Sequence, residues 1–253
     1  MSEPDPRLAR ARDLPGLLSD GRLNAPWLRD PALSPVFTSI ERAGFTVRAV
    51  GGAVRDALRG ASDQSATTDV DLATNALPSE TQAAAEAAGL KSVPTGIAHG
   101  TVTVISDGTP FEVTTLRTDV KTDGRHAEVA FTADWTADAQ RRDFTINAIY
   151  CDQNGALFDP VGGMADLSRS NLRFIGDAAT RIGEDYLRVL RFYRFLAQIP
   201  ALSTDAAAWP AIEGARHGLA LLSAERIHIE LRKLLIADGA VAAIDLMRQH
   251  GTL

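Results

Sequence analysis

The chain has 253 residues, of which 45% are hydrophobic and 23% charged, so its composition is that of a globular protein large enough to bury a full core. Its net charge of -6 disfavours general coating of nucleic acid, which needs a basic surface, but it does not exclude a local basic cleft. The single cysteine, Cys151, excludes an internal disulfide framework, and the N-terminus has no apolar run typical of a signal peptide. No 18 consecutive residues are apolar, so we expect a soluble, cytoplasmic protein.

The first 32 residues contain five prolines and no clear periodicity, which predicts an N-terminal extension that wraps around or trails from the main fold. From 33 to 168, helical and strand patterns alternate. The expected elements are a helix from Pro35 to Gly44, a strand at 45–50, a short helix at 53–60, a strand around 67–75, a helix at 78–89 with Ser79 and Gln82 in capping-box spacing, a hairpin of 100–106 and 109–117, a helix around 138–148 and a hairpin turned by Asn154 and Gly155. Residues 118–134 are polar and predict a mobile loop.

Beyond about residue 165 only helical patterns are found, at 184–197, 218–237 and 240–251. We therefore divide the chain into the extension at 1–32, a mixed domain at 33–168 and an all-helical domain at 169–253.

Two carboxylates stand out in "TTDVDLATN". In a strand, Asp69 and Asp71 point to the same face, and adjacent negative charges make sense when a cation lies between them. Alone, a solvated pair at a strand end is the commoner interpretation. Glu112, in "PFEVTT", faces away from Phe111 and Val113 and can join the acidic face. Three converging carboxylates predict a two-metal Mg²⁺ site for phosphoryl transfer.

A phosphate-binding turn is suggested by "VGGAVRD", where Gly51 and Gly52 lie between a strand and a helix. Without Cβ atoms, their backbone N–H groups can approach an anion, and Arg55 can reach it from the first helical turn. The glycines alone fit an ordinary tight turn equally well, but the acidic pair on the next strand favours a triphosphate.

The pattern "EDYLRVLRFYRF" predicts an amphipathic helix. Its apolar side gathers Tyr186, Val189, Leu190, Tyr193, Leu196 and Ala197, and its other side gathers Glu184, Asp185, Arg188, Arg191 and Arg194 with Phe192 and Phe195. One interpretation is a solvated face with intrahelical salt bridges, above all Glu184 to Arg188. The other is a base reader, in which Asp185 accepts from the exocyclic amine of cytosine or adenine while Arg188 donates to the ring nitrogen. Such a pair would select CTP and ATP over GTP and UTP.

The order of "GGAVRD", "DVDLAT", "RRDFTINA", "DPVGGMADL", "EDYLRVLRFYRF" and "ERIHIELRKLL" resembles that of class II nucleotidyltransferases, a family that contains the bacterial tRNA CCA-adding enzymes and the related poly(A) polymerases. The resemblance runs from about Pro35 to the C-terminus. It implies an α+β nucleotidyltransferase head, with a mainly antiparallel mixed sheet and flanking helices, followed by an all-α neck.

The resemblance also implies residue roles. Asp69 and Asp71 would bind the catalytic metals, with Glu112 as third active-site carboxylate. The nucleotide would be held by Gly51, Gly52 and Arg55, by Arg142, Asp143 and Asn147 of "RRDFTINA", and by Asp185, Arg188, Arg191 and Arg194 of the neck helix. For "RRDFTINA", the residues alone indicate only an amphipathic helix with surface arginines.

Within the family, "PTGIAHGTVTV" and the loop around Arg125 resemble enzymes that add the complete CCA end to tRNA. We therefore expect addition of C and A to the tRNA 3′ end from CTP and ATP, with release of pyrophosphate. A poly(A) polymerase, a nucleotide-binding fragment with weak RNA binding and, less favoured, a metal-dependent phosphohydrolase are the alternatives. Family members normally continue into further helical domains that grip tRNA, so we expect this chain to hold tRNA poorly.

Overall fold

The computed structural model describes residues 14–61, 70–122 and 127–253. The chain forms two compact units: a head unit of residues up to 118, 129–142 and 146–168, and a helical unit of 119–128, 143–145 and 169–253. In the described ranges, no helix is long and apolar enough to cross a membrane.

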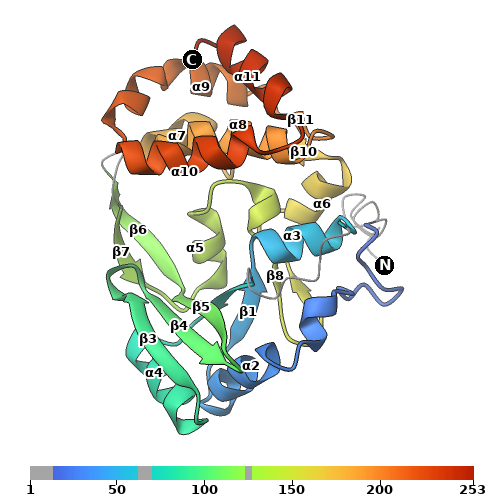
Figure 1. Cartoon of the computed structure of the whole chain (residues 1–253), viewed down its shortest axis with the longest axis vertical. Coiled ribbons are helices and arrows are strands. Elements are labelled where there is room, and N and C mark those ends of the chain that lie inside the picture. Colours follow the sequence, from blue (N-terminus) through green and yellow to red (C-terminus); the bar gives the residue numbers. More distant parts are fainter. Residues whose placement is uncertain (1–13, 62–69, 123–126) are drawn as a thin grey trace, which may run out of the picture. The chain divides into compact units, whose positions relative to one another are not determined.

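The head unit is built on a seven-stranded sheet (Figure 1). In spatial order its strands are β3 (Lys91–Gly96), β4 (Thr101–Ser106), β5 (Thr109–Thr115), β2 (Asp71–Thr74), β1 (Val47–Val50), β8 (Tyr150–Cys151) and β9 (Leu157–Phe158). All neighbours pair antiparallel except β2 and β5, which are parallel. This mainly antiparallel mixed sheet with flanking helices confirms the predicted α+β class.

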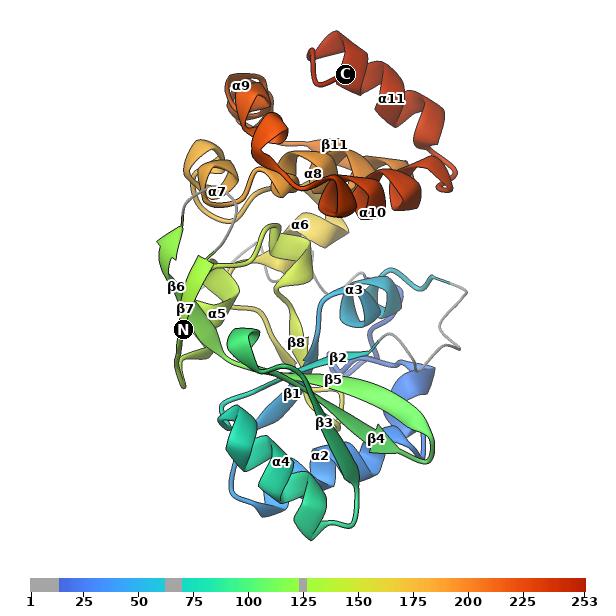
Figure 2. The same cartoon turned by 60° about the vertical axis from the view of Figure 1, so that its left-hand side comes forward.

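The two faces of this sheet differ in what covers them. The helices α2 (Leu33–Arg42) and α4 (Pro78–Ala87) pack together on one face, which buries Leu72 and Val113 (Figure 2). Because side chains alternate along a strand, Asp71 and Glu112 point to the opposite face, where both are exposed. The sheet therefore has a covered apolar face and an accessible face that carries the acids.

Several local predictions are confirmed. Helix α2 is followed by Gly44 with φ of 89°, a conformation that suits glycine at a helix end. The β4–β5 hairpin turns at Asp107 and Gly108, both with positive φ, as an Asp-Gly turn requires. The β8–β9 hairpin turns through Gly155.

The predicted capping box of α4 is wrong in its residues. The N-cap is Leu77, whose backbone N–H donates to the Glu80 carboxylate at 2.7 Å, so Ser79 lies inside the first turn. Pro78 explains the difference, because proline is favoured at the first helical position and places the cap one residue before it.

The predicted helix around 138–148 is also wrong in extent. Helix α5 covers Trp135–Gln140, and a 3₁₀ turn at Thr145–Asn147 follows separately. Between them the chain pairs with another segment: Ile175 N–H donates to Asp143 O at 3.0 Å, and Thr145 N–H donates to Arg173 O at 3.1 Å. A tertiary backbone pairing has replaced the helical hydrogen bonds there.

The N-terminal extension, where described, packs on the head unit. Gly16 N–H donates to Leu58 O at 3.0 Å, Leu23 N–H donates to Gly155 O at 2.8 Å, and Trp27 is buried in the short 3₁₀ helix η1 (Pro26–Arg29). A Cβ on Gly16 would lie 2.0 Å from the Ala57 carbonyl oxygen, so only glycine permits this approach.

Where a mobile loop was predicted, β6 (Arg117–Thr122) and β7 (Ala127–Phe131) form a two-stranded sheet. The prediction weighed polarity too heavily, because β-branched residues such as Thr118, Val120 and Val129 favour strands. Arg125 lies outside the described residues.

The helical unit contains short strands and several helices. In chain order they are β10 (Asn171–Leu172), α7 (Ala178–Glu184), α8 (Leu187–Gln198), β11 (Ser203–Thr204), α9 (Ala208–Gly214), the 3₁₀ helix η5 (Arg216–Leu221), α10 (Ala224–Leu235) and α11 (Ala240–Gln249). The expectation that strands stop near 165 is wrong for β10 and β11, a two-residue parallel pair.

The predicted helix at 184–197 is interrupted at Asp185, whose backbone is extended, so α7 and α8 are separate. The expected two-sided character of α8 is also wrong, because Phe192 and Phe195 are buried. Their rings pack against Phe144, at centroid distances of 6.2 and 5.3 Å, and thus cover the side expected to face solvent.

Candidate active site

The acidic residues lie side by side on the accessible face of the head sheet. Strands β2 and β5 pair in parallel with Leu72 opposite Val113, so the preceding residues, Asp71 and Glu112, are neighbours on the other face. Adjacent exposed carboxylates repel each other unless a cation lies between them. The predicted association of Glu112 with the acidic strand thus has its structural basis in the strand register.

The third predicted carboxylate, Asp69, lies outside the described residues. Within the described ranges, no cluster of three or more His, Cys, Asp or Glu side chains is placed to hold a metal ion. Asp71 and Glu112 nevertheless supply the hard, anionic oxygen donors that Mg²⁺ prefers. On the chemistry of its donors, this face fits such an ion.

The glycine turn lies directly beside this face. Val50 pairs with Asp71, and Gly51 follows it with φ of 85° and ψ of −134°, which side chains with a Cβ rarely adopt. A Cβ built on Gly51 would lie 3.8 Å from Asp71 Oδ2. Gly52 then begins α3 (Gly52–Leu58). The turn and the acidic face, predicted separately, are therefore contiguous.

Arg55 and Asn147 form one hydrogen-bonded group within the head unit. Arg55 Nη1 donates to Asn147 Oδ1 at 2.8 Å, while Nε and Nη2 donate to the two carboxylate oxygens of Asp56 at 2.9 and 2.7 Å. Arg55 is 8% exposed. The structure thus brings two predicted nucleotide-binding residues together and largely buries the guanidinium.

Arg142 is held in a buried ionic cluster around Asp138. Both Arg142 Nη2 and Arg141 Nη2 lie within 2.9 Å of the Asp138 carboxylate, and the Tyr150 hydroxyl donates to it at 2.8 Å. Burial alone would raise the pKa of Asp138, but the two guanidinium groups and the tyrosine hydrogen bond outweigh it and hold this pKa well below its usual range. Asp138 therefore stays charged and fixes Arg142.

In the helical unit, Asp143, Arg191 and Arg194 belong to a chain of ion pairs. Arg191 Nε donates to Asp143 Oδ2 at 2.7 Å, and its Nη1 lies 3.7 Å from Glu230 Oε1. Arg194 Nε donates to Glu230 Oε2 at 2.5 Å. Glu230 of α10 thus joins the two arginines of α8.

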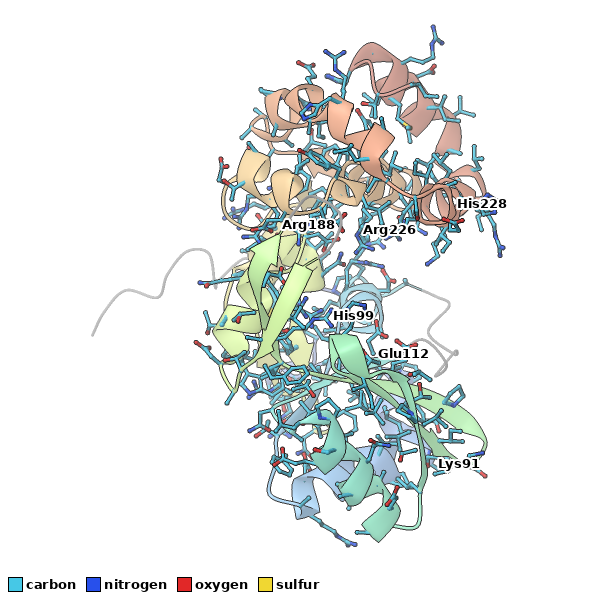
Figure 3. The ribbon with its side chains drawn as sticks, turned by 90° about the vertical axis from the view of Figure 1, so that its left-hand side faces the viewer. Lys91, His99, Glu112, Arg188, Arg226 and His228 are labelled. Carbon is cyan, nitrogen blue, oxygen red and sulfur yellow. The ribbon has the colours of Figure 1, made fainter. Side chains whose placement is uncertain are left out.

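The proposed base-reading residues are held by different partners. Arg226 Nη2 donates to Asp185 Oδ2 at 2.7 Å, and Leu187 N–H donates to Asp185 Oδ1 at 3.1 Å. Arg188 Nη1 lies 2.6 Å from Glu184 Oε2, which confirms the predicted Glu184–Arg188 pair. Arg188 and Arg226 lie on the same side of the helical unit (Figure 3).

The sequence analysis missed several residues of these networks, among them Asp138, Arg226 and Glu230. A signal for Glu230 exists, because its spacing from Ile227 and Leu234 places a charge on the apolar stripe of α10. The i,i+3 and i,i+4 spacing of Asp138 from Arg141 and Arg142 is a further signal. The partner of Arg226 could not be found this way, because Asp185 is 41 residues away.

Two family models match the chain. The model of the "Poly A polymerase head domain" covers residues 47–173, and that of the "Probable RNA and SrmB- binding site of polymerase A" covers residues 201–253.

The similar proteins described next are named after the same enzymatic activity. The chain is 45% identical over 232 residues to the human "CCA tRNA nucleotidyltransferase 1, mitochondrial", an alignment that covers 87% of this chain and 52% of that protein. It is 41% identical over 215 residues to the "CCA-adding enzyme" of Bacillus pumilus, covering 84% and 52% respectively. The chain thus spans about half the length of these relatives.

Among solved structures, the Bacillus stearothermophilus CCA-adding enzyme in complex with CTP matches with a TM-score of 0.78 and 34% identity. The match covers 88% of this chain and 53% of that one. Since the head-domain model spans half of its residues, the chain belongs to the poly(A) polymerase head-domain family, which includes the CCA-adding tRNA nucleotidyltransferases.

Proposed function

We propose that this chain carries the catalytic and nucleotide-selecting part of a CCA-adding tRNA nucleotidyltransferase, which adds C and A to the tRNA 3′ end from CTP and ATP. The observation that carries the proposal is the register of β2 and β5, which places Asp71 beside Glu112 on the accessible face. The names of the relatives and the CTP-bound similar structure support the choice of reaction.

In the proposed reaction, the RNA 3′-hydroxyl attacks the α-phosphate of the nucleotide and pyrophosphate leaves. Asp69 and Asp71 would hold Mg²⁺, which when bound activates the hydroxyl and stabilises charge on the phosphates, with Glu112 as the third active-site carboxylate. The Gly51–Gly52 turn beside Asp71 would present its backbone to the triphosphate. Arg55 would act from its fixed position between Asp56 and Asn147.

Base selection is assigned to Asp185 and Arg188 of the helical unit. Each carboxylate oxygen of Asp185 has a second lone pair beyond the one used by Arg226 or Leu187, so it can still accept from an exocyclic amine. The guanidinium of Arg188 has five N–H donors, and its Nη1 donates to Glu184 Oε2 and to the Arg181 carbonyl oxygen at 2.6 Å each. Arg191 and Arg194, through Asp143 and Glu230, would support this site.

Primer extension with Mg²⁺ tests the proposal. The substrates are tRNA transcripts ending before CCA, after the first C and after the second C, beside an unrelated RNA, with each nucleotide alone and with CTP and ATP together. We expect addition to stop after two C and one A and to occur only on tRNA. Long A tails on any RNA would instead establish poly(A) polymerase activity.

A second candidate, a nucleotide-binding protein with weak RNA binding, is favoured by one observation: the net charge of -6 disfavours binding to RNA phosphates. It predicts no extension despite selective binding of CTP and ATP. Localisation in the cytoplasm stays a prediction, since the human relative is named as mitochondrial.

A further inference from the structure

We propose that Arg226 is a positioning residue for base selection: it fixes the carboxylate of Asp185 and keeps that carboxylate from pairing with Arg188. This inference rests on the proposed function, because it assumes that Asp185 and Arg188 read the base. It adds a residue of α10 on which the selectivity of that pair depends.

The first step is the way in which Asp185 is held. Its backbone is extended, with φ of −154° and ψ of 106°, at the break between α7 and α8, so Asp185 belongs to neither helix. Among the described residues, Leu187 N–H donates to Oδ1 of the carboxylate and Arg226 Nη2 donates to Oδ2. The contact with Arg226 is the shorter, at 2.7 against 3.1 Å, and it is charge-assisted.

The second step is that Arg226 is itself anchored. It lies in the first turn of α10, where its backbone N–H donates to the Ser223 cap. One turn later, Glu230 binds Arg194 and Arg191 of α8 and is nearly fully buried. The buried pairs of Glu230 fix how α10 packs on α8, and this brings Arg226 to Asp185.

The third step is what happens without Arg226. Arg188 lies three residues after Asp185, within reach of an ion pair across the start of a helix. In the structure, Arg188 is engaged by Glu184 and by the Arg181 carbonyl oxygen, and Asp185 by Arg226. Loss of Arg226 frees the carboxylate to turn toward Arg188. Asp185 and Arg188 would then form an ion pair with each other instead of hydrogen bonds to a base.

Access to a base is retained. The side chains of Asp185 and Arg226 are 27% and 35% exposed, so the pair is not sealed in the core. Arg226 uses one lone pair of Oδ2 and leaves the other available. Its role is therefore to orient the acceptor, not to occupy it.

The test measures, by calorimetry, the binding of CTP, ATP, GTP and UTP to the full chain in Mg²⁺ without RNA. We expect Arg226→Ala to reduce the preference for CTP over UTP roughly tenfold, the effect of losing one oriented hydrogen bond to a charged group. Overall triphosphate affinity should change little. Arg226→Lys should restore part of the preference, because it keeps a charged donor.

Arg232→Ala is the matched control, since Arg232 is an exposed arginine on the same helix, and it should leave the preference unchanged. If Arg226→Ala does not fold, as judged by its melting curve, Arg226→Gln replaces it. An unchanged CTP preference in the Arg226 variant, alongside its loss in Asp185→Ala, would overturn this inference and leave the base reader standing. An unchanged preference in Asp185→Ala would remove the base reader itself, and this inference with it.

Discussion

The acids of the head sheet and the acids of the helical unit are placed in opposite ways. Asp71 and Glu112 are exposed neighbours on one sheet face, whereas Asp143 and Glu230 are buried against arginines. A cation bound from solution relieves the repulsion between neighbouring carboxylates, whereas buried ion pairs fix the positions of their own side chains. Metal-dependent chemistry in the head and recognition by fixed side chains in the helical unit, as proposed above, would each require its own kind of arrangement.

The largest expected effect is on catalysis at the exposed face. Asp71→Asn should reduce nucleotide addition by roughly 10³-fold, because a metal ligand is worth several kcal/mol of transition-state stabilisation. The free energy of unfolding should change by less than about 0.5 kcal/mol, as for other exposed positions. Extension rates and urea titrations measure the two quantities. Asp107→Asn, in the β4–β5 turn of the same sheet, is the control. A large loss of stability in Asp71→Asn would contradict the view that the exposed acid serves catalysis and not stability.

Next comes a buried acid within the head. Asp138→Asn should destabilise the protein by about 3 kcal/mol, because it leaves Arg141 and Arg142 without their buried partner. This variant tests whether an acid stabilises the protein because it is buried and paired, whichever of the two units contains it. Loss of activity without loss of stability would contradict that view.

The same residue predicts a pH dependence. The pKa of Asp138 is held well below its usual range in the folded protein, so its contribution is complete above the ordinary value of about 3.9 and is lost as pH falls toward the folded value. The stability difference between the native protein and Asp138→Asn should therefore shrink below about pH 4. Urea titrations at pH 7 and below pH 4 measure it.

A smaller effect is expected in the helical unit. Arg188→Ala should loosen the choice between CTP and UTP by roughly tenfold, about 1.4 kcal/mol, while weakening triphosphate binding less. Nucleotide titrations in Mg²⁺ measure both. If the variant distinguishes CTP from UTP as well as the native protein does, Arg188 does not select the base.

The smallest effect concerns the covered face of the head sheet. Glu80→Ala should cost about 1 kcal/mol of stability, because Glu80 accepts the Leu77 N–H at the start of α4. Ser79→Ala should cost little. Urea titrations of the two variants would distinguish the observed cap from the one expected from the sequence, and neither variant should alter catalysis.

Sequence patterns predicted the elements of the head well where local signals are strong. Residues that readily adopt positive φ predicted the hairpins at Asp107–Gly108 and at Gly155 and the end of α2 at Gly44. Alternation along strands predicted that Glu112 shares a face with the acidic strand. The prediction failed around Asp143 and Asp185, where long-range contacts interrupt helical patterns.

The sequence by itself determined the family, the α+β class and the residue types of the site, because order of motifs, hydrophobic period and turn chemistry are local properties of the chain. Only the tertiary structure decided which polar side chains meet. Arg226 reaches Asp185 across 41 residues, Asn147 meets Arg55 across 92, and Asp71 meets Glu112 through a parallel register. Such partners depend on how elements pack, and no spacing along the chain encodes them.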